Sequence, residues 1–346
     1  MFRRVVALSA SASSSWATSR TTRRSSPVRA RFCGAEYATT TPRRGNACAP
    51  ETDATPMING VPMASIGIKP GETEPLRVVN ASGYRHFDLA VDGQRLQLVA
   101  QDGVPIDTYP GAPPTIQMSD IVIPPAGRAE FLVTGSTTPA ALISKCVQTG
   151  PDGDTSPQIA LGVLADDTNW PNAATATTQA KRVRKLASVQ YSQYYHSTMP
   201  APAAEHTIHF TEGDNGFYLN GAQDDPATAP MITAHSGTTE EWTLENDTQE
   251  LHDFHIHQTH FVVESINGVT QPNQHWVDTA IMSPMGIGVA GQLVPSQMKV
   301  LIDFRDPTIR GTFLFHCHRE PSSTPATTSP PPSTARPNRG RSLRSA

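Results

Sequence analysis

The sequence predicts an all-β protein made of two sandwich-like domains. Short apolar runs recur along most of the chain, and Gly, Pro or Asp-Gly separates one run from the next. Runs of this length and spacing are typical of strands in a β-sandwich or barrel. The length of 346 residues is sufficient for two medium domains. Asn220-Gly221 and Asn267-Gly268 also indicate hairpins, because an Asn-Gly pair fits the tight turn between antiparallel strands.

The N-terminal segment, 1–55, is predicted to be non-globular or targeting-like, because Arg, Ser, Thr and Pro dominate it without a usable period. Residues 1–35 contain seven Arg and no acidic residue, a composition typical of a transit peptide. The short apolar stretch 5–12 resembles a weak export signal. The same residues also fit a disordered or mistranslated segment, so the sequence leaves these alternatives open.

The first predicted domain covers 56–168. Its apolar runs end at turn signals and lie at 76–80, 87–91, 96–99, 121–123 and 130–133. Residues 169–204 are then rich in Ala, Thr and Pro and are predicted to be a linker. The basic run 181–185 within it is expected to be a solvated face.

The second predicted domain covers 205–320. Its expected strands are 207–210, 217–220, 241–244, 260–266, 299–304 and 312–316. The tail, 321–346, contains six Pro and no Val, Ile or Phe, so it cannot bury a core and is predicted to be disordered.

The composition excludes several classes of protein. The net charge of -4 argues against a general nucleic-acid binder. No apolar run approaches the roughly 18 residues that a membrane helix requires, so no membrane span is expected. The four cysteines have no CxxC spacing, which argues against a structural zinc knuckle. One disulfide among Cys33, Cys48 and Cys146 is compatible with the sequence, which does not assign the pair.

The histidines concentrate in the second domain, where seven of the twelve lie between 252 and 318. His252, His255 and His257 fall on one probable strand, and His316-Cys317-His318 ends another. Side chains alternate between the two faces of a strand. We therefore expect His255, His257, His316 and His318 to share one face. Cys317 should point to the opposite face, where His252 can join it.

This ligand set predicts a copper site. Imidazoles with one thiolate are the ligands of electron-transfer copper centres, and a histidine cluster without carboxylates suits copper or zinc rather than magnesium or calcium. Zinc is the weaker alternative, because the spacing does not resemble a closed structural zinc site. Either motif alone is more often structural; the prediction depends on the two occurring together.

The remaining candidates are weaker. His260 and His275 lie nearby in the sequence but outside the matched spacing, so we expect them to support the ligands or to be structural. Met282, Met285 and Met298 are expected to pack in the core. No partner can be named from the sequence for the other histidines, His86, His196, His206, His209 and His235.

The segments 251–257 and 315–318 resemble the penultimate copper motif and the start of the last copper motif of the multicopper oxidases, the family that includes the laccases. Further segments resemble the same family: 276–279, 302–307, 311–313, 76–82 and 101–103. The resemblance covers about 57–320. It implies two cupredoxin-like, plastocyanin-like Greek-key β-sandwich domains, which correspond to the middle and C-terminal domains of the family.

The resemblance also implies the role of each ligand. His252 and Cys317 would hold a type 1 copper that takes electrons from substrate, and His255 would serve a type 2 copper. A type 3 copper pair would use His257, His316 and His318. Together these coppers would reduce dioxygen to water while a small reducing substrate is oxidised: a phenol, an aromatic amine or a metal ion. The family further implies a periplasmic or secreted location.

The sequence departs from the family pattern at both ends. The first two His-x-His motifs of the family have no counterpart before residue 57. Ser322 and Thr327 occupy the positions of the second type 1 histidine and of its axial ligand, and Asp253 stands where Pro is frequent. We therefore expect a truncated or frameshifted product whose copper sites are incomplete. Alone it should show weak or absent catalysis, and another chain or an oligomer would supply the missing ligands. The alternatives are a non-catalytic copper-binding cupredoxin-like module and an inactive remnant.

Overall fold

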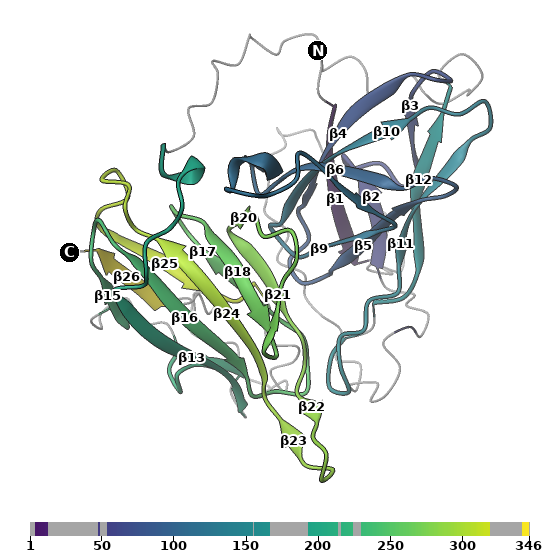
Figure 1. Ribbon diagram of the computed structural model, residues 1–346. Helices are drawn as coiled ribbons and strands as arrows, with labels where there is room; N and C mark the ends of the chain where they lie inside the picture. The colour runs from purple at the N-terminus through teal and green to yellow at the C-terminus, as the bar shows by residue number, and fades with distance from the viewer. Residues whose placement is uncertain are drawn as a thin grey trace, which may run out of the picture.

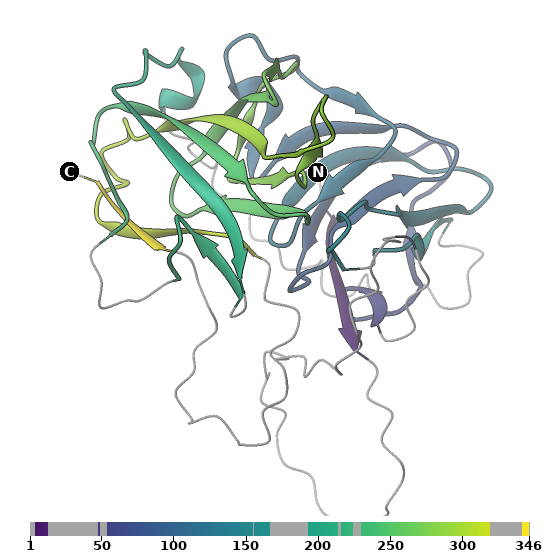
Figure 2. The ribbon, with the colours of Figure 1, turned by 90° about the horizontal axis from the view of Figure 1, so that it is seen from below.

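The computed structural model describes residues 4–12, 48, 54–154, 156–166, 193–213, 216–223, 230–318 and 341–345. These residues form two β-sandwich domains that lie side by side (Figure 1), and the view from below separates the same two bodies (Figure 2). The first domain comprises the described residues up to 166, and the second comprises those from 193 onward. Among the described residues, the helical elements are two 3-10 turns, η1 (Ile106–Thr108) and η3 (Gln193–His196). This architecture confirms the all-β prediction. In the part of the chain that the structure describes, no helix has the length and apolar character needed to cross a membrane.

The first domain packs two sheets face to face. One sheet has the order β2-β1-β4-β10-β6-β7, with β8 also paired to β6, and the other has the order β3-β12-β11-β5-β9. The strands are β1 (Arg4–Ala12), β2 (Ala54–Ile58), β3 (Ala64–Gly67), β4 (Thr73–Asn80), β5 (Phe87–Val91), β6 (Leu96–Gln101), β7 (Val104–Pro105), β8 (Ile116–Met118), β9 (Ile121–Ile123), β10 (Arg128–Thr134), β11 (Ala140–Lys145) and β12 (Ile159–Ala165).

Alternating side chains fill the space between these two sheets. Leu76 and Val78 on β4 and Phe131 on β10 are almost completely buried, as are Phe87 and Leu89 on the opposite sheet. Successive residues of a strand point to opposite faces, so the apolar alternation in the sequence places one face of each sheet in the core.

The second domain repeats this arrangement. One sheet has the order β14-β13-β16-β24-β18-β19, with β20 paired to β18, and the other has the order β15-β26-β25-β17-β21. The strands are β13 (Ala204–Gly213), β14 (Gly216–Leu219), β15 (Ile232–Ala234), β16 (Thr239–Asn246), β17 (His252–Ile256), β18 (Phe261–Ile266), β19 (Val269–Thr270), β20 (Trp276–Val277), β21 (Thr279–Met282), the hairpin β22 (Gly286–Ile287) with β23 (Leu293–Val294), β24 (Ser296–Asp303), β25 (Thr312–His316) and β26 (Arg341–Ser345).

An aromatic cluster forms the core of the second domain. The buried Trp242 ring lies with its centroid 6.2 Å from Phe254, 6.5 Å from Phe304 and 5.3 Å from Phe315. Met282 and Met298 are buried in the same cluster, as expected for core methionines. Phe254 and Phe315 belong to the two strands that carry the histidines, so this core fixes the backbone of the candidate site.

Two strands lie inside the ranges that were expected to remain outside the domains. β1 pairs in parallel with β4 and antiparallel with β2, and β26 pairs antiparallel with β25 and in parallel with β15. β1 lies between β2 and β4, and β26 between β15 and β25. Composition does not predict such strands, because backbone hydrogen bonds to strands far apart in the sequence hold them in place. The other domain boundaries proposed from the sequence stay predictions.

The domains meet through a small apolar patch and through a tight turn. Val104 of the first domain is buried with Val262 and Trp276 of the second. The Asp102-Gly103 turn joins β6 to β7, where Gln101 pairs with Val104, and has positive φ at both positions, 47° and 86°. A two-residue turn of this kind favours Asp or Asn followed by Gly. The turn carries Asp102 to the domain boundary.

Candidate metal centre

Two neighbouring strands of one sheet present the histidine motifs. β17 pairs antiparallel with β25, and His255 lies opposite His316 in this register. On its other side, β17 pairs with β21, where His255 lies opposite Thr279. The pairing therefore brings together two histidine segments that are about sixty residues apart in the sequence.

The core-facing side of these strands carries the thiol. His252, Phe254 and Ile256 on β17 are buried, as is Phe315 on β25, and Cys317 packs against the same core. This arrangement leaves His252 Nδ1 3.4 Å from Cys317 Sγ. The backbone N–H of Asp253 also lies 3.4 Å from this sulfur and donates to it. The two groups expected to share the thiol face are therefore adjacent.

The opposite side gathers four imidazoles. His255 lies at ring-centroid distances of 5.0 Å from His257, 5.3 Å from His316 and 5.1 Å from His318. His316 lies 5.2 Å from His257 and 4.6 Å from His318. The clustering expected from strand alternation is present, although β25 ends at His316 and His318 follows it. Metal binding by these side chains stays a prediction.

The donor atoms of this cluster fit a metal. One nitrogen from each of His255, His257 and His316 lies within 4.8 Å of the others. His257 Nε2 and His316 Nε2 are 3.1 Å apart, and His316 Nδ1 donates to the carbonyl oxygen of Cys317. His318 Nε2 is buried and has no hydrogen-bond partner among the described residues. A buried imidazole nitrogen without a partner is costly unless an ion binds it.

Burial also keeps His257 and His318 in the neutral form that metals bind. Burial lowers the pKa of His318 to about 3, and the neighbouring imidazoles His316, His255 and His257 add to this effect. Burial followed by the charge of His255 lowers the pKa of His257 as well. A metal binds the neutral imidazole, so these two rings are prepared for a cation at neutral pH.

Contacts on the far side of His255 fix the orientation of its ring. Its Nδ1 lies 2.9 Å from the Asp278 carbonyl oxygen and 2.9 Å from Thr279 Oγ1, while Thr279 Oγ1 donates to Asp278 Oδ1 over 2.9 Å. Nδ1 therefore carries the proton, and Nε2 is left for the cluster. Such support is typical of metal-binding histidines. In the sequence, only the family resemblance of its segment marks Asp278.

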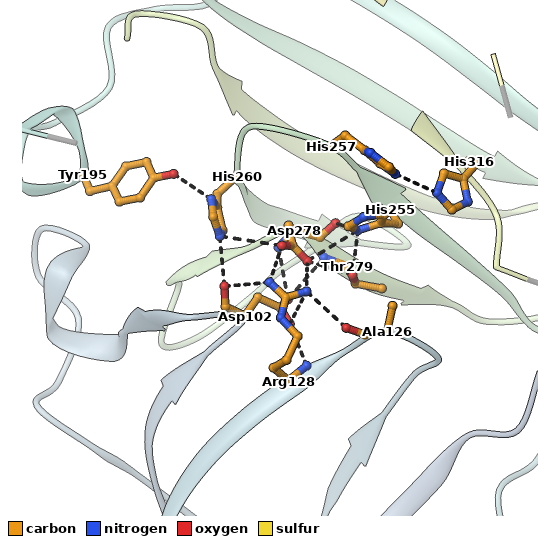
Figure 3. Close-up of polar contacts among 10 residues, drawn as sticks. All are labelled: Asp102, Ala126, Arg128, Tyr195, His255, His257, His260, Asp278, Thr279 and His316. Atoms are coloured by element: carbon orange, nitrogen blue, oxygen red, sulfur yellow. Dashed lines mark hydrogen bonds and ion pairs between the residues drawn. The ribbon is translucent and has the colours of Figure 1, made fainter. Parts of the chain in front are cut away.

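The first domain continues this set of contacts (Figure 3). Arg128 Nη1 donates to Asp278 Oδ1 over 2.8 Å, and Arg128 Nη2 donates to Asp278 Oδ2. Burial opposes ionisation of Asp278, but hydrogen bonds from His255 and Arg128 outweigh it and hold the pKa of Asp278 well below its usual range. Burial, together with the charge of Asp278, raises the pKa of Asp102.

His260 lies at the same boundary and has a structural role. Its Nε2 donates to the Asp102 carbonyl oxygen over 3.1 Å, so its Nδ1 accepts the Tyr195 hydroxyl at 2.6 Å. Tyr195 stacks on Trp276 with a centroid distance of 4.7 Å. Burial lowers the pKa of His260 and raises that of Tyr195.

Several histidines without a sequence-predicted partner have one in the structure. His86 Nε2 lies 2.8 Å from Asp253 Oδ1 across the domain boundary, and both side chains are buried. His209 contacts Asp247 at 2.8 Å and Glu245 at 3.5 Å. The other pairs are His206 with Glu240 and His275 with Gln101. No sequence signal identified these pairs, because their members are not matched by spacing.

The cysteines divide between two roles. Cys48 and Cys146 form a disulfide, which assigns the pair that the sequence left open, whereas Cys317 lies at the histidines. Cys33, Ser322 and Thr327 lie outside the described residues.

Two sandwich domains, with a thiol and four imidazoles on adjacent strands, are the arrangement expected of a copper protein of the β-sandwich class. Comparison with protein families agrees: models described as multicopper oxidase match residues 32–165 and 197–322. The chain belongs to the multicopper oxidase family, its domains are cupredoxin-like, and the metal implied is copper.

Solved structures of similar fold include a multicopper oxidase from Campylobacter jejuni described as a metallo-oxidase, with 18% identity and a TM-score of 0.57, covering 76% of this chain and 54% of that one. A multicopper oxidase from Pseudomonas thermotolerans has 16% identity and a TM-score of 0.58, covering 100% and 68%. A multicopper oxidase variant from Aquifex aeolicus has 18% identity and a TM-score of 0.56, covering 76% and 56%. At these identities the likeness shows the fold. The chain spans little more than half the length of the first of these relatives. No curated protein sequence matches the chain.

Proposed function

We propose that the chain is a copper oxidoreductase that oxidises a phenol, an aromatic amine or a metal ion and passes the electrons to dioxygen, which is reduced to water. The observation that carries the proposal is the division of ligands between two faces of adjacent strands. One face has the His252–Cys317 pair at 3.4 Å, and the other has four clustered imidazoles. Cys317 lies on the first face and is joined through the backbone to His316 and His318 on the second.

The proposed roles follow from this division and from family membership. His252 and Cys317 would hold a type 1 copper, and His255 would hold a type 2 copper. His257, His316 and His318 would contribute to a type 3 pair. Bound copper would supply one-electron transfer on the thiol side and reduction of dioxygen on the imidazole side.

The residues of the chain prepare these sites. The backbone from Cys317 to its two neighbours is a short covalent route between the two faces. Phe254 and Phe315 are completely buried next to the ligands and exclude water from the core side. Phe217 packs edge-on against the His252 ring at 4.9 Å and fixes its plane. The carbonyl of Asp278 holds the proton of His255 on Nδ1.

The second candidate is a module that holds copper without turnover, and a specific observation favours it. The described residues bring together only four imidazoles, whereas an oxygen-reducing centre of this family requires more. In the catalytic case, the remaining ligands come from residues outside the described parts or from a second chain. Oxygen consumption distinguishes the two candidates.

We further propose a secreted or periplasmic location. The Cys48–Cys146 disulfide supports it, because disulfides persist in oxidising compartments and are rare in the cytosol.

The test is copper counting on the purified chain, with visible absorption and oxygen uptake. We expect bound copper and a thiolate-to-copper band that Cys317→Ser removes while imidazole-bound copper remains. His257→Gln and His316→Gln should lower the copper content, whereas His235→Gln, at an exposed position outside the cluster, should not. Unchanged copper in both cluster variants would refute the ligand assignment. Full copper without oxygen uptake on any of the three substrate classes would establish the non-catalytic module.

A further inference from the structure

A continuous set of hydrogen bonds joins the first domain to one candidate copper ligand. It begins at Arg128 on β10, passes through Asp278 and Thr279 at the start of β21, and ends at the His255 ring on β17 (Figure 3). None of the six candidate ligands lies in the first domain. The contact described here reaches the cluster through Asp278 and Thr279, which hold His255, and these residues can be tested.

The last step of the set fixes the His255 ring. Thr279 Oγ1 donates its proton to Asp278 Oδ1 and so presents a lone pair to His255 Nδ1. The Asp278 carbonyl oxygen accepts from the same Nδ1–H. Both contacts favour the ring tautomer with the proton on Nδ1, which leaves Nε2 facing His257 and His316. The direction of the Thr279 hydroxyl depends on where the Asp278 carboxylate lies.

Arg128 fixes that carboxylate. Its two terminal nitrogens donate to the two oxygens of Asp278, a fork-to-fork geometry that sets both position and plane. Arg128 Nη2 also donates to the Asp102 carbonyl oxygen, and Arg128 Nη1 lies 3.6 Å from the Asp102 carboxylate. The guanidinium therefore separates two carboxylates that would otherwise repel each other.

Asp102 fixes the backbone beneath the ring. Its Oδ2 accepts the backbone N–H groups of Asp278 at 3.0 Å and of Thr279 at 3.2 Å, and its Oδ1 accepts the N–H of Arg128 at 2.9 Å. One buried carboxylate thus ties β10 of the first domain to the start of β21. The charged and titratable groups that face this site are Arg128, Asp102, Asp278, His255 and His260.

The hydrogen bonds of Arg128 and Asp102 are not needed merely to hold the two domains together. The domains are also joined by the apolar patch around Trp276 and by the buried His86–Asp253 pair, and neither contact is made by a ring of the imidazole cluster. We infer that Arg128 and Asp102 are positioning residues for His255, so that the domain without copper ligands orients a ligand of the neighbouring domain. The inference rests on the proposed ligand role of His255.

Two measurements on the full chain test it. The first is ¹⁵N NMR of the copper-free protein at pH 8, with the His255 ring assigned through His255→Gln. The wild type should show one tautomer, with Nδ1 protonated. Arg128→Met should give a mixture, because the Asp278 carboxylate loses its two donors and is repelled by Asp102. Thr279→Val should also give a mixture, and Thr279→Ser, which keeps the hydroxyl, should restore the wild-type state.

The second measurement is the affinity for Cu²⁺, from competitive titration and from the electron paramagnetic resonance spectrum. Loss of a group that orients a metal-bound histidine lowers metal affinity about 10- to 100-fold. We expect a loss in this range for Arg128→Met and a smaller loss for Arg128→Lys. Arg77→Met is the matched control, because it removes a guanidinium–carboxylate pair of similar exposure, Arg77–Glu130, within the first domain. It should change neither measurement.

The outcomes separate the inference from the proposed function. If both Arg128 variants keep the wild-type tautomer and the wild-type Cu²⁺ affinity, the inference is overturned. This holds even if Thr279→Val gives a mixture of tautomers and a lower Cu²⁺ affinity. A wild type that binds no copper would overturn the proposed function, while the tautomer measurement would still decide the inference. If Arg128→Met does not fold, Arg128→Lys and the Thr279 pair carry the test.

Discussion

The buried His86–Asp253 pair joins the two domains. Removing one member of it should lower the free energy of unfolding, although neither residue belongs to the apolar core of its domain. His86 Nε2 and Asp253 Oδ1 are 2.8 Å apart, with side-chain exposures of 2% and 1%. The second carboxylate oxygen of Asp253 is buried without a hydrogen-bond partner among the described residues. Because both side chains are buried, water does not replace a partner that is removed.

The expected magnitudes follow from this burial. His86→Leu leaves a buried carboxylate without its partner, which should cost about 3–5 kcal/mol of unfolding free energy. Asp253→Leu leaves a buried imidazole nitrogen unpaired and should cost about 1–3 kcal/mol. The double variant replaces both polar groups with apolar ones and should be nearly neutral. The coupling free energy should then exceed about 2 kcal/mol.

Urea unfolding followed by tryptophan fluorescence measures all four proteins. Trp242 is buried in the second core and Trp276 at the boundary, so the signal reports both unfolding and separation. Thr73→Val, at an exposed hydrogen bond in the first domain, is the control and should stay within about 0.5 kcal/mol of wild type. If the two single effects add in the double variant to within about 0.5 kcal/mol, the pair is not coupled and the reasoning is refuted.

Three further predictions concern stability. Burial raises the pKa of Asp88 to about 6, so the folded chain retains a proton that the unfolded chain loses above about pH 4; this stabilisation is lost as pH rises through 6. Asp88→Asn should therefore raise the free energy of unfolding at pH 8, by less than about 1 kcal/mol because the group is partly exposed, and leave it unchanged at pH 4. Cys48→Ser opens a disulfide that spans 98 residues and should cost about 2–5 kcal/mol, with no further loss when Cys146→Ser is added; an additive second loss would contradict the pairing. Phe315→Ala empties a fully buried site and should cost about 3–5 kcal/mol in the same assay, whereas Val269→Ala, at an exposed position, should change stability by under about 0.5 kcal/mol.

Local alternation is what made the centre of the fold predictable. The same two-residue period that buries Phe254 and Ile256 places His255 on the opposite face, so sequence spacing predicts that His255 and His257 share a face. Asn267-Gly268 and Asn220-Gly221 form the expected tight turns, with positive φ at all four positions. Both inferences need only neighbouring residues.

Long-range register was not predictable in the same way. Arg128 and Asp278 are separated by 150 residues, and the sequence gives no reason to pair them. The Asp102-Gly103 dipeptide indicated a turn, but not that its carboxylate would accept three backbone N–H groups from two domains. Such contacts depend on how the two sandwiches dock, which is set by side chains from many strands at once.

β17 is where the local and the long-range order meet. Its side chains Asp253 and His255, and that of His257 directly after the strand, point away from the core of the second domain. Asp253 contacts His86 of the first domain, and His255 is held by the residues that Arg128 fixes. His257 faces His316 on the neighbouring strand. A change in domain docking should therefore act first on Asp253 and His255, which are both held by contacts that reach the first domain, and through them on His257. Because His252 and Cys317 lie on the core side of the same strand pair, the thiol face should be less sensitive to that change than the imidazole face.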